Sequence, residues 1–176
     1  MPESSSRPLP PDDPARRLVL AQPDRDASLP HVAVVGDTYT ILLTGKDTDG
    51  RYCLIDMHVP SGGGPPPHRH DFEETFIVVD GEVEFTFRDQ KTVVHAGATV
   101  HIPANAPHAF RNVSKGAARL LCLCSPAGVE EFFLAVGDRV DSRMAQPPEM
   151  DEAGKIAWIK KAKALAPQYR TEILGA

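Results

Sequence analysis

Residues 62–87 read GGGPPPHRHDFEETFIVVDGEVEFTF, and this stretch decides how the chain folds. In its last part, residues 82–87, apolar and polar side chains alternate, which is the pattern of a β-strand that buries one face. The dipeptide Asp80-Gly81 separates this strand from an apolar run at 76–79. Because both residues of such a dipeptide tolerate positive φ angles, the sequence predicts a β-hairpin here.

Short strand patterns continue on both sides of this stretch. They lie at residues 31–35, 39–44, 51–59, 92–95, 99–102, 108–113 and 119–125. Asp49-Gly50, between the second and third of them, predicts another hairpin. No helical period separates these strands, as a parallel sheet would require. Many short strands with turn signals between them predict an all-β sandwich or barrel.

The hydrophobic period changes after Pro126. Apolar residues at 129, 132, 133 and 136 follow the spacing i, i+3, i+4 and i+7, which predicts a helix that ends at Gly137. A second helix is expected at roughly 151–166. The fold class is therefore all-β with C-terminal α-helices.

We expect three regions along the chain. The first 17 residues contain five prolines and several charges. A segment of this composition cannot bury enough apolar surface to offset the entropy lost on ordering, so we expect residues 1–17 to be disordered. The β-barrel is expected over residues 18–128, and a helical extension packed on the barrel over residues 129–176.

Composition narrows the classes of partner and location. The 176 residues include 24 Asp and Glu against 19 Lys and Arg. This acidic excess argues against nucleic acid or an anionic membrane as a partner, because both favour a clustered basic surface. The N-terminus lacks the apolar core of a signal peptide, and no apolar run approaches the roughly 20 residues of a membrane-spanning helix. We therefore expect a cytoplasmic protein with neither nucleic acid nor a membrane as its partner.

The three cysteines, Cys53, Cys122 and Cys124, are too few and too scattered for a disulfide framework. Cys122 and Cys124 are two residues apart and therefore share one face of a strand. One interpretation is a redox or metal-binding pair. We favour the other, in which both are small buried hydrophobic residues.

Four side chains form a candidate metal site: His68, His70, Glu74 and His108. The even spacing of the first three places them on one face of an extended chain, and a second strand would bring His108 alongside. Three imidazoles and one carboxylate suit a divalent transition metal (Fe, Ni, Co, Mn, Cu or Zn) better than calcium or magnesium, which favour oxygen ligands. In an octahedral shell, four protein ligands leave two positions for substrate or dioxygen, whereas a structural zinc site is closed.

The neighbouring polar residues are expected to lie outside this site. Glu73 has the opposite strand parity to Glu74 and should face away from the metal. We interpret His95 and His101 as surface or core residues rather than as supports for the ligands. His58 is not assigned a role.

Two motifs resemble those of the cupin superfamily. Residues 62–81 match the pattern G-x5-H-x-H-x3-E-x6-G at Gly62, His68, His70, Glu74 and Gly81. The segment GATVHIPANAPHAFRN matches G-x5-P-x-G-x2-H-x3-N at Gly97, Pro103, His108 and Asn112. Asn105 stands where the family usually has Gly, and Asn is the next-best residue for positive φ. The resemblance implies a cupin jelly-roll barrel with its metal inside, in a protein that is usually a homodimer.

The segments SPAGVEEFFLAVG (125–137) and ALAPQYRTEILGA (164–176) resemble the C-terminal helices of single-domain, quercetinase-like cupins. This resemblance implies a metal-dependent dioxygenase, an oxidoreductase, that acts on a small aromatic or polyphenolic, quercetin-like substrate. Glu74 would then be a catalytic base as well as a ligand. Two alternatives stay open: a metal-dependent isomerase, cyclase or lyase without oxygen chemistry, and a non-catalytic barrel that binds a small molecule.

Overall fold

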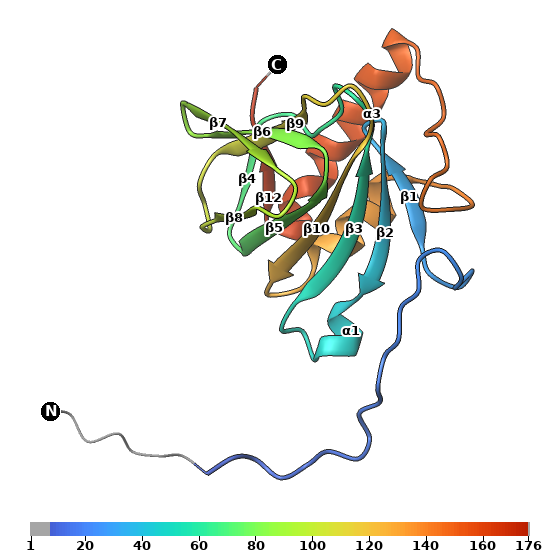
Figure 1. The fold of residues 1–176 in the computed structure, drawn as a ribbon, viewed down its shortest axis with the longest axis vertical. Helices are drawn as coiled ribbons and strands as arrows, with labels where there is room; N and C mark the ends of the chain where they lie inside the picture. The colour runs from blue at the N-terminus through green and yellow to red at the C-terminus, as the bar shows by residue number, and fades with distance from the viewer. Residues whose placement is uncertain (1–7, 176) are drawn as a thin grey trace, which may run out of the picture.

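The strands form two antiparallel sheets in the computed structural model, which describes residues 8–175 (Figure 1). The first sheet has the order β11-β1-β2-β3-β10-β5-β8, with β11 Asp138–Arg139, β1 His31–Val34, β2 Asp37–Leu43, β3 Cys53–Val59, β10 Ala118–Ser125, β5 Glu73–Asp80 and β8 Thr99–Ile102. The second has the order β12-β4-β9-β6-β7, with β12 Thr171–Ile173, β4 His68–His70, β9 His108–Asn112, β6 Glu82–Phe87 and β7 Gln90–His95. The predicted all-β class is confirmed.

The core lies between the two sheets because each strand turns alternate side chains inward. Phe76 on β5, Phe85 on β6 and Phe110 on β9 are all buried. Their ring centroids lie 5.2 to 5.8 Å apart, in tilted and edge-on arrangements that aromatic rings favour. This aromatic group joins the sheets next to the candidate site.

One predicted hairpin is wrong. Strands β5 and β6 do not pair with each other: β5 pairs with β10 and β8, whereas β6 pairs with β9 and β7. Asp80-Gly81 therefore carries the chain from one sheet to the other. Gly81 has a φ of 87°, and a Cβ at this position would lie 2.8 Å from the Cβ of Ala118. A sheet-to-sheet corner and a hairpin need the same local residues, so the dipeptide alone cannot separate them.

The hairpin predicted at Asp49-Gly50 is partly confirmed. Strands β2 and β3 are antiparallel neighbours, and both turn residues have positive φ angles, 59° and 73°. The connection is longer than a two-residue turn because it contains the one-turn helix α1, Gly45–Thr48.

Both predicted helices are present. Helix α2 spans Val129–Val136, and helix α3 spans Glu152–Leu165, followed by the 3₁₀ turn η1, Ala166–Tyr169. Phe132 and Val136 of α2 are buried together with Ala162 of α3. The indole Nε1–H of Trp158 donates to the carbonyl oxygen of Val136 at 3.1 Å, which ties the two helices to each other.

The end of the chain departs from the helical expectation. Residues 171–173 form strand β12, which pairs with β4 in the register Thr171↔His70 and Ile173↔His68 (Figure 1). This strand closes the edge of the second sheet, next to the strand that carries two candidate metal ligands. A three-residue strand is too short to show a period in the sequence.

The N-terminal segment was expected to be disordered. Residues 8–30 contain neither helix nor strand, and Figure 1 shows their first part running away from the barrel. Residues 1–7 lie outside the described part of the chain, so the disorder expected for 1–17 and the boundaries at 18–128 and 129–176 stay predictions.

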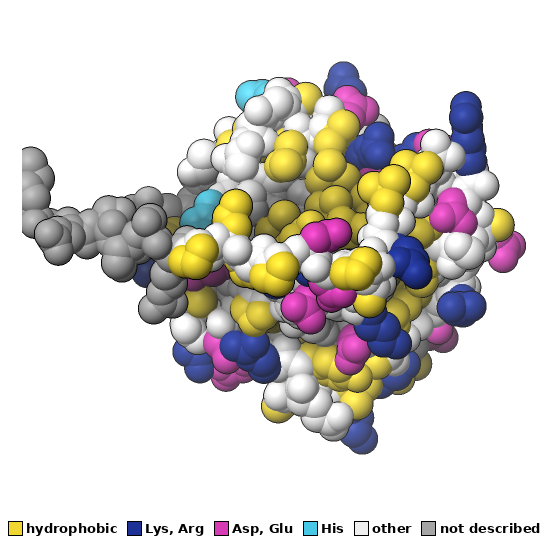
Figure 2. Space-filling view, turned by 90° about the horizontal axis from the view of Figure 1, so that it is seen from below, with side chains coloured by type: hydrophobic (Ala, Val, Ile, Leu, Met, Phe, Trp, Pro, Cys, Tyr) yellow, Lys and Arg dark blue, Asp and Glu magenta, His cyan; other side chains and the backbone are white. Residues whose placement is uncertain are grey.

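Basic and acidic side chains are interspersed on the face of the molecule that Figure 2 shows. Among the described residues, no helix is both long and apolar enough to cross a membrane.

Candidate metal centre

The four predicted ligands meet inside the barrel. His68 and His70 come from β4, and His108 lies directly across from His68 on the paired strand β9. Glu74 comes from β5 in the opposite sheet and closes the group. One potential ligand atom from each residue lies within 4.8 Å of the others, and all but the half-buried His68 are buried. We call His68, His70, Glu74 and His108 the four-residue cluster.

Backbone carbonyl groups fix the orientation of each imidazole. Nδ1 of His68 lies 2.9 Å from the carbonyl oxygen of Pro66, Nδ1 of His70 lies 2.9 Å from that of Phe72, and Nδ1 of His108 lies 3.0 Å from that of Ala106. A carbonyl oxygen only accepts hydrogen bonds, so each Nδ1 carries a proton and donates it. A neutral ring in this tautomer presents the lone pair of Nε2, the atom that binds metals.

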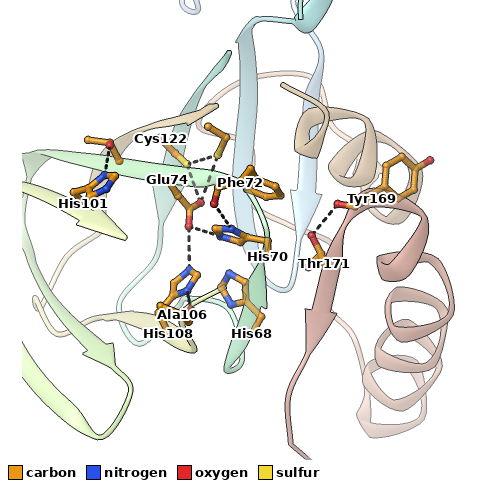
Figure 3. A network of polar contacts seen from close by, with 12 residues as sticks. His68, His70, Phe72, Glu74, His101, Ala106, His108, Cys122, Tyr169 and Thr171 are labelled. Carbon is orange, nitrogen blue, oxygen red and sulfur yellow. Dashed lines mark hydrogen bonds and ion pairs between the residues drawn. The ribbon is translucent and has the colours of Figure 1, made fainter. Parts of the chain in front are cut away.

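These lone pairs converge on the carboxylate. Oε2 of Glu74 lies 3.0 Å from Nε2 of both His70 and His108 (Figure 3). With Nδ1 already protonated, each of these contacts needs either a second proton on the ring or a cation that both atoms can bind. A divalent cation meets all the lone pairs at once, so the donor set fits a metal. The group that Figure 3 shows is therefore a chemically suitable ligand set.

Protonation states agree with this reading. Burial lowers the pKa of His68 to about 4, so its imidazole stays neutral near neutral pH. Burial would by itself raise the pKa of Glu74, but the hydrogen bonds with His108 and His70 outweigh it and hold the pKa well below its usual range. A neutral His68 imidazole and an ionised Glu74 carboxylate are in the forms that bind a metal.

The loops around the cluster are tightly packed. Gly64 has a φ of 133°, and a Cβ there would lie 2.1 Å from the carbonyl oxygen of Phe110, so the ligand loop can approach β9 only without a side chain. Asn105, where the cupin motif usually has Gly, adopts a φ of 67° as predicted. Its backbone N–H donates to the carbonyl oxygen of His70 at 2.6 Å, which links the two motif loops.

Sulfur atoms occupy the other side of Glu74. The thiol of Cys122 donates to Oε1 of Glu74 at 3.1 Å, and Sγ of Cys124 lies 3.7 Å from the same oxygen (Figure 3). Both cysteines are free and buried, as expected for core residues. Burial raises the pKa of the Cys122 thiol to about 12, so the thiol keeps its proton. Strand parity predicted the shared face, but the contact with Glu74 depends on the pairing of β10 with β5.

An apolar cavity of about 60 Å³ opens beside His68, His70 and Glu74. Its walls come from the barrel and from helices α2 and α3, and include Val34, Met57, Phe132, Phe133 and Trp158. Ile173 of β12 also lines it. No pattern in the sequence indicates the roles of Trp158 and Ile173, because the tertiary packing of the C-terminal segment brings them to the cavity.

The structure separates the remaining polar residues from the cluster. Glu73 is exposed, and its carboxylate pairs with Nε2 of His101 at 3.1 Å on the outer surface. His95 is also exposed and pairs with Glu82 at 3.3 Å. The predictions that Glu73 faces away and that these two histidines lie outside the site are confirmed. His58 lies on β3, is half-buried and does not belong to the four-residue cluster.

Fold and site together define a class, a two-sheet antiparallel barrel with an internal cluster that could hold one metal ion. Residues 55–124 match the Cupin domain family. A RmlC-like cupin from Shewanella frigidimarina NCIMB 400 superposes with a TM-score of 0.51, at 17% identity over 59% of this chain and 89% of that chain. A predicted oxalate decarboxylase from Thermotoga maritima gives a TM-score of 0.54, at 15% identity over 61% of this chain and 99% of that chain. Residues 55–124 therefore match a cupin domain, and the barrel has the fold of these two structures.

Sequence similarity also extends to an enzyme. The chain is 25% identical over 123 residues to quercetin 2,3-dioxygenase of Bacillus subtilis (strain 168). The match covers 64% of this chain and 36% of that relative, so the chain spans about a third of the enzyme it resembles.

Proposed function

We propose that the chain is a metal-dependent dioxygenase for a small hydroxylated aromatic molecule. The observation that carries the proposal is the position of the four-residue cluster, three of whose members, His68, His70 and Glu74, line an apolar cavity between the barrel and helices α2 and α3. The similarity to quercetin 2,3-dioxygenase adds support. In a ring-cleaving dioxygenase reaction, both atoms of dioxygen enter the substrate while its carbon–carbon bonds break. The substrate then supplies all four electrons, so the reaction needs no external reductant.

The four-residue cluster would hold one divalent transition metal through Nε2 of His68, His70 and His108 and through Oε2 of Glu74. Such a metal supplies Lewis acidity that favours a deprotonated hydroxyl and, if it is redox-active, a route to dioxygen. Glu74 is the candidate catalytic base, because its ionised Oε2 faces the point where the imidazole Nε2 atoms converge and could take the hydroxyl proton there. The apolar walls would exclude water and orient the aromatic ring.

Cavity size favours a one-ring substrate over a flavonol. A cavity of roughly 150 Å³ accommodates benzene in another protein, and pockets for drug-sized ligands reach roughly 300–1,000 Å³. At about 60 Å³, the cavity described here is smaller than either. A three-ring, quercetin-like molecule would need the cavity walls to move further than a single ring would.

Metal analysis and oxygen uptake test the proposal together. Natively purified protein is expected to carry a redox-active metal near one equivalent, and His68→Ala and His108→Ala are expected to lose it. His101→Ala, which changes an exposed histidine outside the cluster, is the matched control and should retain the metal. Oxygen consumption is then measured with catechol and with quercetin, and the proposal expects uptake with the smaller molecule.

Two results would overturn the proposal. Turnover that continues without dioxygen, in a protein that carries only zinc, would favour an isomerase, cyclase or lyase. Tight binding of an aromatic ligand without turnover, under any metal, would favour a non-catalytic binding barrel. We further propose that the protein is a homodimer in the cytoplasm, without a nucleic-acid or membrane partner. Light scattering of the purified protein measures its oligomeric state.

A further inference from the structure

We propose that Cys122 and Cys124 are positioning residues, which hold Glu74 so that a single carboxylate oxygen faces the three histidines. The inference rests on the proposed metal site and adds a role for two residues that the mechanism above does not use. It depends neither on the oxygen chemistry nor on the identity of the substrate.

The two oxygens of Glu74 have different partners. Oε1 accepts a hydrogen bond from the Cys122 thiol at 3.1 Å and lies 3.7 Å from Sγ of Cys124. Oε2 lies 3.0 Å from Nε2 of both His70 and His108. Figure 3 shows the carboxylate between the sulfur atoms on one side and the imidazole rings on the other. The contacts with sulfur therefore point Oε1 away from the histidines.

Strand register produces this arrangement. On the inner face of the first sheet, Cys124 of β10 lies directly across from Glu74 of β5, and Cys122 lies across from Phe76 two residues further along. The two thiols therefore lie beside the same carboxylate, with their Sγ atoms 3.6 Å apart. Cys122 and Cys124 are both 0% exposed, so water does not compete for Oε1 from that side.

A carboxylate held in this way can offer a metal one oxygen rather than two. If the thiols are removed, Oε1 is free to turn toward the metal and occupy a position that substrate would otherwise use. Groups that orient a ligand typically change metal affinity by about 10- to 100-fold when they are mutated. The alternative is that the cysteines only fill space in the core, as small apolar residues often do.

Cobalt(II) binding distinguishes these roles. Its visible absorption changes with the number and geometry of the ligands, and direct binding of a thiolate adds an intense near-ultraviolet band. The full chain is titrated with cobalt(II) as wild type, as Cys122→Ala/Cys124→Ala and as Cys122→Ser/Cys124→Ser. Cys53→Ala is the matched control, because it removes a buried thiol of the same size from β3, across from Cys124, and retains the two thiols that contact Glu74.

We expect wild-type protein to show no thiolate band. The double alanine variant should show an altered visible spectrum, because the carboxylate can then bind through both oxygens, and an affinity that differs from wild type by about tenfold or more. The double serine variant keeps hydrogen-bond donors and should restore most of the wild-type spectrum, and Cys53→Ala should match wild type. Thermal unfolding of each variant confirms that the compared proteins are folded.

Three results would overturn the inference. Equal spectra and affinities in the wild-type and alanine proteins would show that the cysteines only fill space, and equal changes in the serine and alanine variants would show that hydrogen bonding is not what matters. A thiolate band in wild type would make the cysteines ligands instead. If wild-type protein binds no cobalt at all, the metal site itself is refuted, an outcome distinct from the other three.

Discussion

Asp37 offers the sharpest test of how burial controls a charge in this protein. Its side chain is 0% exposed, and its Oδ1 atom is without a hydrogen-bond partner among the described residues. The hydroxyl of Tyr39 donates to Oδ2 at 3.2 Å. Burial raises the pKa of Asp37 from its ordinary value of 3.8 to about 7, despite that hydrogen bond. We predict that Asp37→Asn removes a pH-dependent cost of folding.

The direction and size of the effect follow from linkage. An acid whose pKa is raised in the folded state takes up a proton on folding, so the free energy of unfolding falls as pH rises between the two pKa values. The slope approaches about 1.4 kcal/mol per pH unit for one proton. With pKa values of 3.8 and about 7, Asp37 should lower the free energy of unfolding by about 2 to 3 kcal/mol between pH 5 and pH 8. Asn does not titrate, so the variant lacks this loss.

Urea unfolding of both proteins at pH 5, 6, 7 and 8 measures the effect, with metal removed by a chelator. Trp158, the single tryptophan, reports unfolding by fluorescence. All other titrating groups are shared, so the difference between the variant and wild type isolates Asp37. The free energy of unfolding of Asp37→Asn, relative to that of wild type, should rise by about 2 to 3 kcal/mol from pH 5 to pH 8. A shift below about 0.5 kcal/mol would refute the argument that burial keeps this carboxyl protonated.

Four further substitutions test the core, the ligand loop and the strand parity. Phe76→Ala should lower the free energy of unfolding by about 3–5 kcal/mol in urea, because it leaves a cavity in the aromatic core. Gly64→Ala should lower the melting temperature sharply, since its Cβ would lie 2.1 Å from the carbonyl oxygen of Phe110; an unchanged value would contradict the close approach. Glu73→Gln should leave metal content unchanged, whereas Glu74→Gln should reduce it, and equal losses in elemental analysis would contradict the assigned strand faces.

Local patterns in the sequence predicted much of the site. His68, His70 and Glu74 lie close together in the chain, and their even spacing is a property of extended backbone itself. His108 was expected alongside them on a second strand, and the structure places it across from His68. The same parity argument correctly turned Glu73 toward solvent, where it pairs with His101. Alternation and helical period likewise predicted most strands and both helices.

Pairing between distant segments could not be predicted in the same way. Asp80-Gly81 fits a hairpin and a corner between sheets equally well, and only the neighbours of β5 and β6 distinguish them. Strand β12 beside β4 is another pairing that the sequence does not signal.

The sequence by itself determined the all-β class of the fold, the two helices and the set of residues that could bind a metal. These follow from periodicity and residue chemistry, which act over a few neighbouring positions. The tertiary structure alone decided how β10 pairs with β5, and so placed Cys122 and Cys124 against Glu74. It also decided that Trp158 and Ile173 enclose the cavity. Such contacts depend on which surfaces pack together across the whole chain, and a local pattern does not encode that choice.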